Sequence, residues 1–213
     1  MRLITSLMAT YSIETLWSKL WARRFSPDDA RLRFELGGEA FDNTSQPVPR
    51  FLQALHRSST IADAVFRENC VALVAWNGRE PNALDYPEVK NGFDALAATG
   101  FDAPQTGEWK SILYPESDDD EPYVWTVRSY DISANKAARD TILWHAIADE
   151  MPVYPSAPVV TFLIDPVHAI MLHVYDDRGM DIMADAAARL RDTYTAFDGW
   201  LLDYDRNRMA NLF

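Results

Sequence analysis

The sequence contains one cysteine among 213 residues, so no disulfide can form within the chain. A chain of this kind suits a reducing compartment, and we expect a cytoplasmic protein. Cys70, the single thiol, lies inside the apolar run CVALVAW. Because apolar surroundings raise the pKa of a thiol, we interpret Cys70 as a buried, unreactive side chain and not as a nucleophile.

Long hydrophobic runs are also absent. No segment approaches the roughly 18 uninterrupted apolar residues of a membrane-spanning helix. The stretch MRLITSLMATYSIETLW carries one arginine and a short apolar segment interrupted by Thr5 and Ser6. Glu14 and Trp17 stand where the small residues of a cleavage site would be expected. The sequence therefore predicts a soluble protein without a signal peptide or a membrane span.

Positive charge is scarce, because 20 Lys and Arg residues stand against 32 Asp and Glu residues and give a net charge of −12. Binding to nucleic acid or to an anionic membrane requires clustered basic residues, so we expect neither partner. Five acidic residues gather in PESDDDEP, residues 115–122. We interpret this run as a solvated loop; a docking surface for a basic partner and loose cation binding are the alternatives.

Established catalytic motifs are missing. The sequence has no G-x-S-x-G, no glycine-rich phosphate loop, no C-x-x-C and no H-E-x-x-H. His168 and His173 are five residues apart on one predicted strand and therefore point to opposite faces, so we expect no joint histidine site. The sequence implies no cofactor. An enzymatic function would rest on aspartates alone.

Length and composition indicate one domain. A chain of 213 residues buries roughly 70% of its unfolded surface. Seven Trp and ten Phe residues supply a large aromatic core. We expect a single domain over residues 1–213, with a helical part over about residues 1–68 and an α+β core over about residues 69–213.

Apolar residues recur with helical spacing in several segments. In residues 13–21 they fall at i, i+3, i+4, i+7 and i+8, which is one helix face, and Ser12 or Thr10 can cap it. Residues 4–8 can extend this helix backwards. The predicted helices cover residues 13–21, 50–66 with a break at 58–60, 93–98 and about 135–150.

Shorter apolar runs predict strands in the first two thirds of the chain. Residues 31–36 alternate between apolar and polar, which is typical of a half-buried strand. Residues 70–76 form a continuous apolar run, which favours a strand covered on both faces. Residues 109–114 and 123–130 flank the acidic run, and we expect them to pair as a hairpin.

Residues 159–206 contain the longest apolar runs and the clearest turn signals. Asp165-Pro166 and the glycine at 179 mark two turns between strands expected at 159–164, 168–175 and 180–183. These three strands predict an antiparallel meander, followed by a helix from the N-cap Asp185 to about Ala196. The predicted fold class is α+β, with a mostly antiparallel sheet and helices packed on it. The tail after Gly199 fits a short helix or a terminal strand equally well.

Acidic side chains gather in two places within this stretch. Asp176, Asp177 and Asp181 lie in or beside the second turn, and Asp203 and Asp205 lie in the tail. If the tail returns over the hairpin, these carboxylates converge near Arg178 and Arg206. We expect a structural cluster, in which Asp176 caps the turn, Arg178 pairs with Asp203 or Asp205, and Arg206 pairs with a turn carboxylate. A binding surface made of the same groups is one alternative. A divalent-cation site of Asp176, Asp177, Asp203 and Asp205 is another.

Three stretches carry a resemblance to a known family. RFELGG at residues 33–38, YDDRG at 175–179 and LDYDR at 202–206 resemble marks of the bacterial family domain of unknown function 3885. The resemblance covers about residues 31–206. It implies a bacterial cytoplasmic protein of a family without an established activity, so it assigns no catalytic residue. It also links the chain loosely to toxin and immunity gene clusters.

These observations lead to three functional hypotheses. The first is an interaction protein, for example an immunity-type inhibitor, that docks on a basic partner such as a toxin. The second is a divalent-cation-dependent phosphoester hydrolase that uses the aspartate clusters. The third is a scaffold whose aspartates and arginines are purely structural. Because catalytic motifs are missing, the sequence favours a protein that is not an enzyme. It does not indicate the oligomeric state, since nothing marks which edge of the sheet is open.

Overall fold

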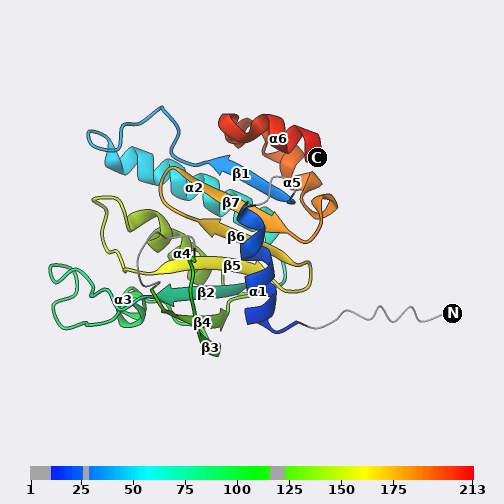
Figure 1. Cartoon of the computed structure of the whole chain (residues 1–213). Coiled ribbons are helices and arrows are strands. Elements are labelled where there is room, and N and C mark those ends of the chain that lie inside the picture. The colour runs from blue at the N-terminus through cyan, green and yellow to red at the C-terminus, as the bar shows by residue number, and fades with distance from the viewer. Residues whose placement is uncertain (1–10, 26–28, 116–122) are drawn as a thin grey trace.

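The computed structural model describes residues 11–25, 29–115 and 123–213 (Figure 1). Its strands are β1 (Arg31–Glu35), β2 (Val71–Trp76), β3 (Gln105–Ser111), β4 (Trp125–Asp131), β5 (Val160–Asp165), β6 (Ile170–Val174) and β7 (Gly179–Ala184). Its α-helices are α1 (Ile13–Ala22), α2 (Pro47–Val65), α3 (Gly92–Ala98), α4 (Lys136–Ala148), α5 (Arg191–Ala196) and α6 (Arg206–Leu212). Short 3-10 segments are η1 (Arg23–Phe25), η2 (Ala187–Arg189), η3 (Asp198–Trp200) and η4 (Asp203–Asp205).

The strands form one seven-stranded sheet in the order β1-β7-β6-β5-β2-β4-β3, and every neighbouring pair is antiparallel. The predicted meander is β5, β6 and β7, in register through Leu163, Leu172 and Ile182. The predicted hairpin around the acidic run is β3 and β4. The α+β fold with a mostly antiparallel sheet is therefore confirmed. Strand β1, from the N-terminal part of the chain, pairs with β7 and so joins the same sheet.

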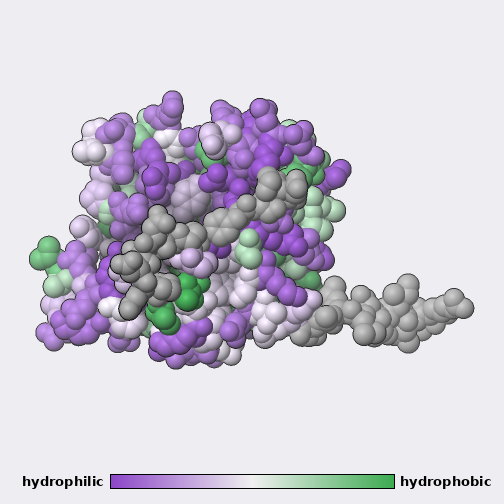
Figure 2. All heavy atoms as spheres, viewed as in Figure 1, coloured by the Kyte–Doolittle hydropathy of each residue, from purple (hydrophilic) through white to green (hydrophobic). Residues whose placement is uncertain are grey.

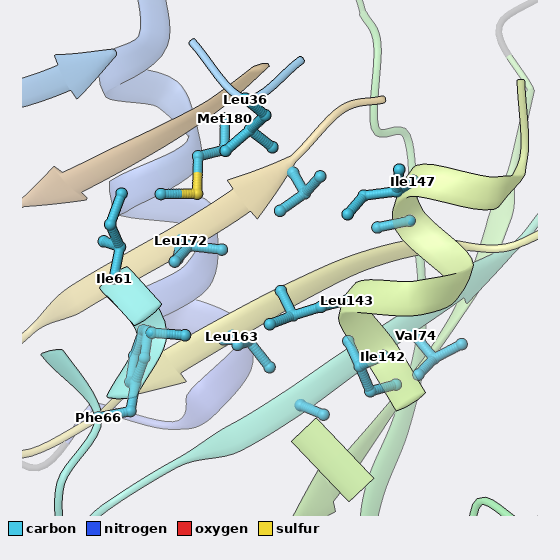
Figure 3. Close-up of a cluster of buried hydrophobic side chains, with 14 of the residues drawn as sticks. Leu36, Ile61, Phe66, Val74, Ile142, Leu143, Ile147, Leu163, Leu172 and Met180 are labelled. Carbon is cyan, nitrogen blue, oxygen red and sulfur yellow. The ribbon is translucent and has the colours of Figure 1, made fainter. Parts of the chain in front are cut away.

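Helices α2, α3 and α4 cover one face of the sheet (Figure 1). Figure 3 shows side chains of α2 and α4 meeting those of the strands in this layer. Ile142, Leu143 and Ile147 of α4 are buried there. Burying one such side chain stabilises the fold by about 2 kcal/mol. This layer is the main core of the protein.

Helix α1 crosses the opposite face of the sheet (Figure 1). The predicted N-cap is Ser12, whose hydroxyl accepts the backbone N–H of Thr15 at 3.2 Å. Trp17 and Trp21 point into the sheet, and the Trp21 ring lies 4.9 Å from the ring of Phe162 in an edge-to-face contact. The Trp21 indole N–H donates to the backbone oxygen of Leu113 at 2.8 Å. The two tryptophans are core residues. The expected extension over residues 4–8 lies outside the described residues, as does most of the acidic run.

Helix α2 differs from the prediction. It begins at Pro47, which occupies the first helical position, and continues without a break to Val65. The predicted break at residues 58–60 is wrong, because the polar side chains bond carbonyls of the helix itself. The Ser58 hydroxyl donates to Leu55 O at 3.1 Å and the Thr60 hydroxyl to His56 O at 2.7 Å.

The chain after β7 also differs from the prediction. Asp185 is not an N-cap, because its carboxylate accepts from the Arg189 guanidinium. The expected single helix is divided into η2 and α5. The tail contains both the expected extended segment and the expected helix, each of them short. Leu201 makes one antiparallel bridge with Phe34 of β1, and helix α6 follows. Among the described residues, every helix is too short or too polar to cross a bilayer.

Candidate functional site

The turn between β6 and β7 is fixed by its own aspartate. Asp176 is 2% exposed, and its Oδ1 accepts the backbone N–H of Arg178 at 2.7 Å. Its Oδ2 accepts Arg178 Nε at 2.7 Å, and these bonds raise the pKa of Arg178. A Cβ at Gly179 would lie 2.7 Å from the backbone oxygen of Phe34 and closer still to the Tyr175 hydroxyl. Asp176 therefore caps the turn as predicted, and only glycine fits at 179.

Arg50 of α2 ties this turn to the loop after β1. Its Nε donates to Asp177 Oδ2, and its Nη1 donates to Gly38 O at 2.6 Å and to Phe41 O at 2.9 Å. The Asp177 side chain is 4% exposed and that of Arg50 13%. A Cβ at Gly37 would lie 2.7 Å from Arg50 Cζ, so a glycine is required where the guanidinium passes the backbone. One buried ion pair thus holds two loops together.

The three stretches that carry the family resemblance meet at this point. Arg57 Nη1 of α2 donates to Glu35 O at 2.9 Å and so holds the end of β1. The tail lies along the outer side of β1, where Leu202 N donates to Arg33 O at 2.9 Å. Between these segments is a cavity of about 610 Å³. It is lined by Glu35, Gly38, Glu39, Phe41, Asp42, Asn43, Arg50, Tyr175, Arg178 and Leu202.

The charges of this cavity are unbalanced. Both lining arginines already have carboxylate partners, because Arg50 pairs with Asp177 and Arg178 pairs with Asp176. Among the described residues, the lining carboxylates Glu35, Glu39 and Asp42 have no ion-pair partner. Backbone and hydroxyl donors of the next turn lower the pKa of Asp42, which keeps it ionised. The cavity therefore presents three carboxylates without a direct ion pair, while Arg57 attracts Glu35 and Arg50 attracts Asp42 at longer range.

Comparison with known proteins agrees with the sequence resemblance. The family model described as "Domain of unknown function (DUF3885)" matches residues 10–205, which is most of the chain. The chain belongs to this family. No curated protein and no solved structure shows a significant match to it. The DUF3885 match covers the strands, helices and turn that surround the cavity.

A second polar cluster of this DUF3885 chain lies on the α1 side of the sheet. Asp181 of β7 is 8% exposed and accepts Arg33 Nε at 3.1 Å, with Arg31 Nη1 at 3.7 Å. Burial raises the pKa of Asp181. Asp205 of η4 pairs with Arg208 Nη2 at 2.8 Å and with Arg31 Nη2 at 3.9 Å. Arg31 thus links Asp181 and Asp205, and the cluster attaches the tail to β1.

The predicted partners of Arg178 and Arg206 are wrong. Arg178 pairs with Asp176 and, at 3.7 Å, with Glu150. Arg206 pairs within the tail, with Asp198 at 2.8 Å and with the exposed Asp203 at 3.0 Å. The physical reason is the path of the tail. It meets β1 antiparallel at Phe34, near the turn, and then runs towards Arg31 and away from the turn, so Asp205 pairs with Arg208 and Arg31.

The carboxylates suggested for a cation site do not converge. Asp176 and Asp177 are each held by an arginine in or beside the turn, whereas Asp205 is held by Arg208. Asp203 is 92% exposed at its side chain. Within residues 11–25, 29–115 and 123–213, no group of three or more His, Cys, Asp or Glu side chains is placed to hold a metal ion.

His145, His173 and Cys70 are buried side chains. His145 is fully buried, accepts Ala157 N–H at its Nδ1 and lies 3.0 Å from the Thr99 hydroxyl through its Nε2. Burial lowers the pKa of both His145 and His173 to about 4, so both are neutral at pH 7. His168 lies in the β5–β6 turn and not on the strand, where it contacts Asp165 at 2.8 Å. Burial raises the pKa of Cys70 to about 12.

Sequence reasoning found the turn aspartates but missed most residues of the cavity. Glu35 and Gly38 belong to the RFELGG stretch, Tyr175 and Arg178 to YDDRG, and Leu202 to LDYDR, so the family resemblance was the available signal for the site. The sequence did not single out Arg50, because nothing near it distinguishes it from an exposed polar residue on a helix. Its contact with Asp177 spans 127 residues of sequence.

Proposed function

We propose that this protein is an interaction module that docks on a basic protein partner, with a lysine or arginine side chain of the partner entering the cavity. One observation carries the proposal. Glu35, Glu39 and Asp42 face the cavity without an ion-pair partner among the described residues, whereas Arg50 and Arg178 are neutralised from within. A cationic group entering the cavity would gain carboxylate partners without displacing an existing pair.

The rest of the chain supports the same partner chemistry. A net charge of −12 repels acidic molecules and accelerates the approach of basic ones, an effect that weakens as salt is added. The walls of the cavity are already ordered, because Arg50 holds the loop after β1 through two backbone carbonyls. A preordered site loses less conformational entropy on binding. A basic toxin bound by an immunity-type protein in a bacterial cytoplasm is the partner class that fits the proposal.

The hydrolase is not proposed. A cation at the turn would compete with Arg178 and Arg50 for Asp176 and Asp177, because both carboxylates already accept a guanidinium. A metal that binds there would leave Arg50, whose side chain is 13% exposed, without its carboxylate partner. This cost opposes the cation site.

The proposal is tested with a tetra-arginine peptide as the probe. Fluorescence anisotropy measures the affinity for the peptide. Changes in the backbone amide shifts of Gly38 and Asn43 in NMR spectra show whether the peptide binds at the cavity. The double variant Glu35→Gln/Glu39→Gln removes two carboxylates from the cavity. Exposed pairs contribute about 0.2–1 kcal/mol each, so we expect about a fivefold weaker affinity.

The matched control is Glu14→Gln/Glu88→Gln, which changes the net charge equally at exposed positions outside the cavity. We expect this control to lose less than twofold. Equal losses in both variants would mean diffuse attraction to an acidic protein and would overturn the proposal. Binding that leaves the amide shifts of Gly38 and Asn43 unchanged would overturn it as well.

A further inference from the structure

One edge strand of the sheet is covered by another segment of the chain, and the other edge strand is open. The outer side of β1 is covered by the tail, through the Phe34–Leu201 bridge and the hydrogen bond from Leu202 N to Arg33 O. Strand β3, at the other edge, pairs with β4 alone, and no other strand of the described chain lies on its outer side. An open strand presents unpaired N–H and C=O groups that can accept a further strand.

We propose that β3 pairs with β3 of a second copy of this chain, antiparallel and about a two-fold axis at Trp109. The sequence of β3 complements itself in this register. Glu108 of each copy stands opposite Lys110 of the other, so the axis generates two opposite-charge cross-strand pairs. Gly107, which has no side chain, stands opposite the small Ser111, so nothing bulky obstructs the approach.

Within one chain, Lys110 and Glu108 remain able to form these pairs. Lys110 donates to the Thr126 hydroxyl and has no carboxylate partner among the described residues. Glu108 accepts Arg128 Nε of β4 at 2.8 Å and keeps a second carboxylate oxygen for a cation on its open side. Both side chains are exposed, on the face opposite to Trp109, whose ring packs on Trp17 at 6.0 Å. In the pair of copies, Glu108 therefore lies between Arg128 of its own chain and Lys110 of the other.

The ends of β3 limit the pairing to a short segment. The register of β3 with β4 shifts between Gln105 and Gly107, so the regular part covers Gly107 to Ser111. Beyond Ser111, Ile112 is 42% exposed, and Val124, the residue before β4, is 58% exposed. Figure 2 shows hydrophobic atoms gathered low on this face, over the part of the sheet where Figure 1 draws β3 and β4. These apolar groups extend the contact beyond the paired backbone.

Charge reversal tests the register. Lys110→Glu and Glu108→Lys each place like charges opposite one another at two symmetric positions. We expect each variant alone to weaken the dimer about tenfold or more. When the two variants are mixed, every cross-strand pair becomes opposite in charge again, so a heterodimer should form. Sedimentation velocity measures all three samples, with one variant fluorescently labelled in the mixture.

Lys90→Glu is the matched control, because Lys90 is exposed and lies in the loop before α3, away from β3. The control should sediment as the unmodified protein does. A monomeric unmodified protein at about 0.5 mM would overturn the proposal. So would a dimer that both variants leave intact, or variants that stay monomeric after mixing. Circular dichroism of each variant confirms that a lost dimer does not reflect unfolding.

Discussion

The ion pair between Arg50 and Asp177 should be a major contributor to stability near the cavity. Arg50→Ala leaves the Asp177 carboxylate, 4% exposed, without its cation and releases Gly38 O and Phe41 O. Removing one partner of a buried pair costs about 3–5 kcal/mol. For a domain of this size that corresponds to a fall in Tm of roughly 10 °C. We expect the loop after β1 to lose order along with this stability.

Urea unfolding followed by tryptophan fluorescence measures the effect, with Arg206→Ala as the matched control. Arg206 pairs only within the exposed tail, so its loss should cost about 1 kcal/mol or less. The double variant Arg50→Ala/Asp177→Ala removes both charges and should be more stable than the sum of the two single variants implies. A cost for Arg50→Ala no larger than that for Arg206→Ala would refute this reasoning.

Two further predictions concern pH and glycine. Burial lowers the pKa of His145 and His173 to about 4, below the unfolded value of about 6.5, so the unfolded state binds more protons between these values. The free energy of unfolding should therefore be constant above about pH 6.5 and fall as the pH drops towards 4, by about 3 kcal/mol for each histidine. Urea midpoints that do not change between pH 7 and pH 5 would contradict this. Gly179→Ala places a Cβ against the Tyr175 hydroxyl and a backbone oxygen and should cost about 1–3 kcal/mol. Gly199→Ala, with open space around the added Cβ, should be close to neutral, and calorimetric Tm values compare the two.

Local patterns were sufficient to predict the strands, the meander of β5, β6 and β7, and the hairpin of β3 and β4, but not the order of the whole sheet. The strands β5 and β6 are apolar runs separated by the Asp165-Pro166 turn signal, and such runs have few alternatives to pairing with each other. The continuous apolar run of β2 indicated burial on both faces, and β2 lies between β5 and β4 in the sheet. In these segments the local propensity and the tertiary environment agree.

The tail could not be assigned from its sequence because two competing interactions divide it. Leu201 is drawn to the edge of β1 for one bridge, and the chain then turns into α6, where Met209 is fully buried. A periodicity of two or of 3.6 residues needs a longer segment than either piece provides.

The candidate site was predictable only in part. A turn signal placed Asp176 correctly, since its partner is two residues away. The partners of Asp177 and Asp181 are 127 and 148 residues away, at Arg50 and Arg33. Which arginine a carboxylate meets depends on the order of the strands and the path of the tail, and neither is encoded near the turn.

The covered edge at β1 sets an upper limit on association through the sheet. A sheet with two open edges can add copies at both ends and grow into a fibre, whereas one with a single open edge can form only a closed pair. In this protein the attachment of Leu201 and Leu202 to β1 removes the second growth point. The tail therefore prevents further strand addition at β1, and pairing through β3 joins two copies and no more.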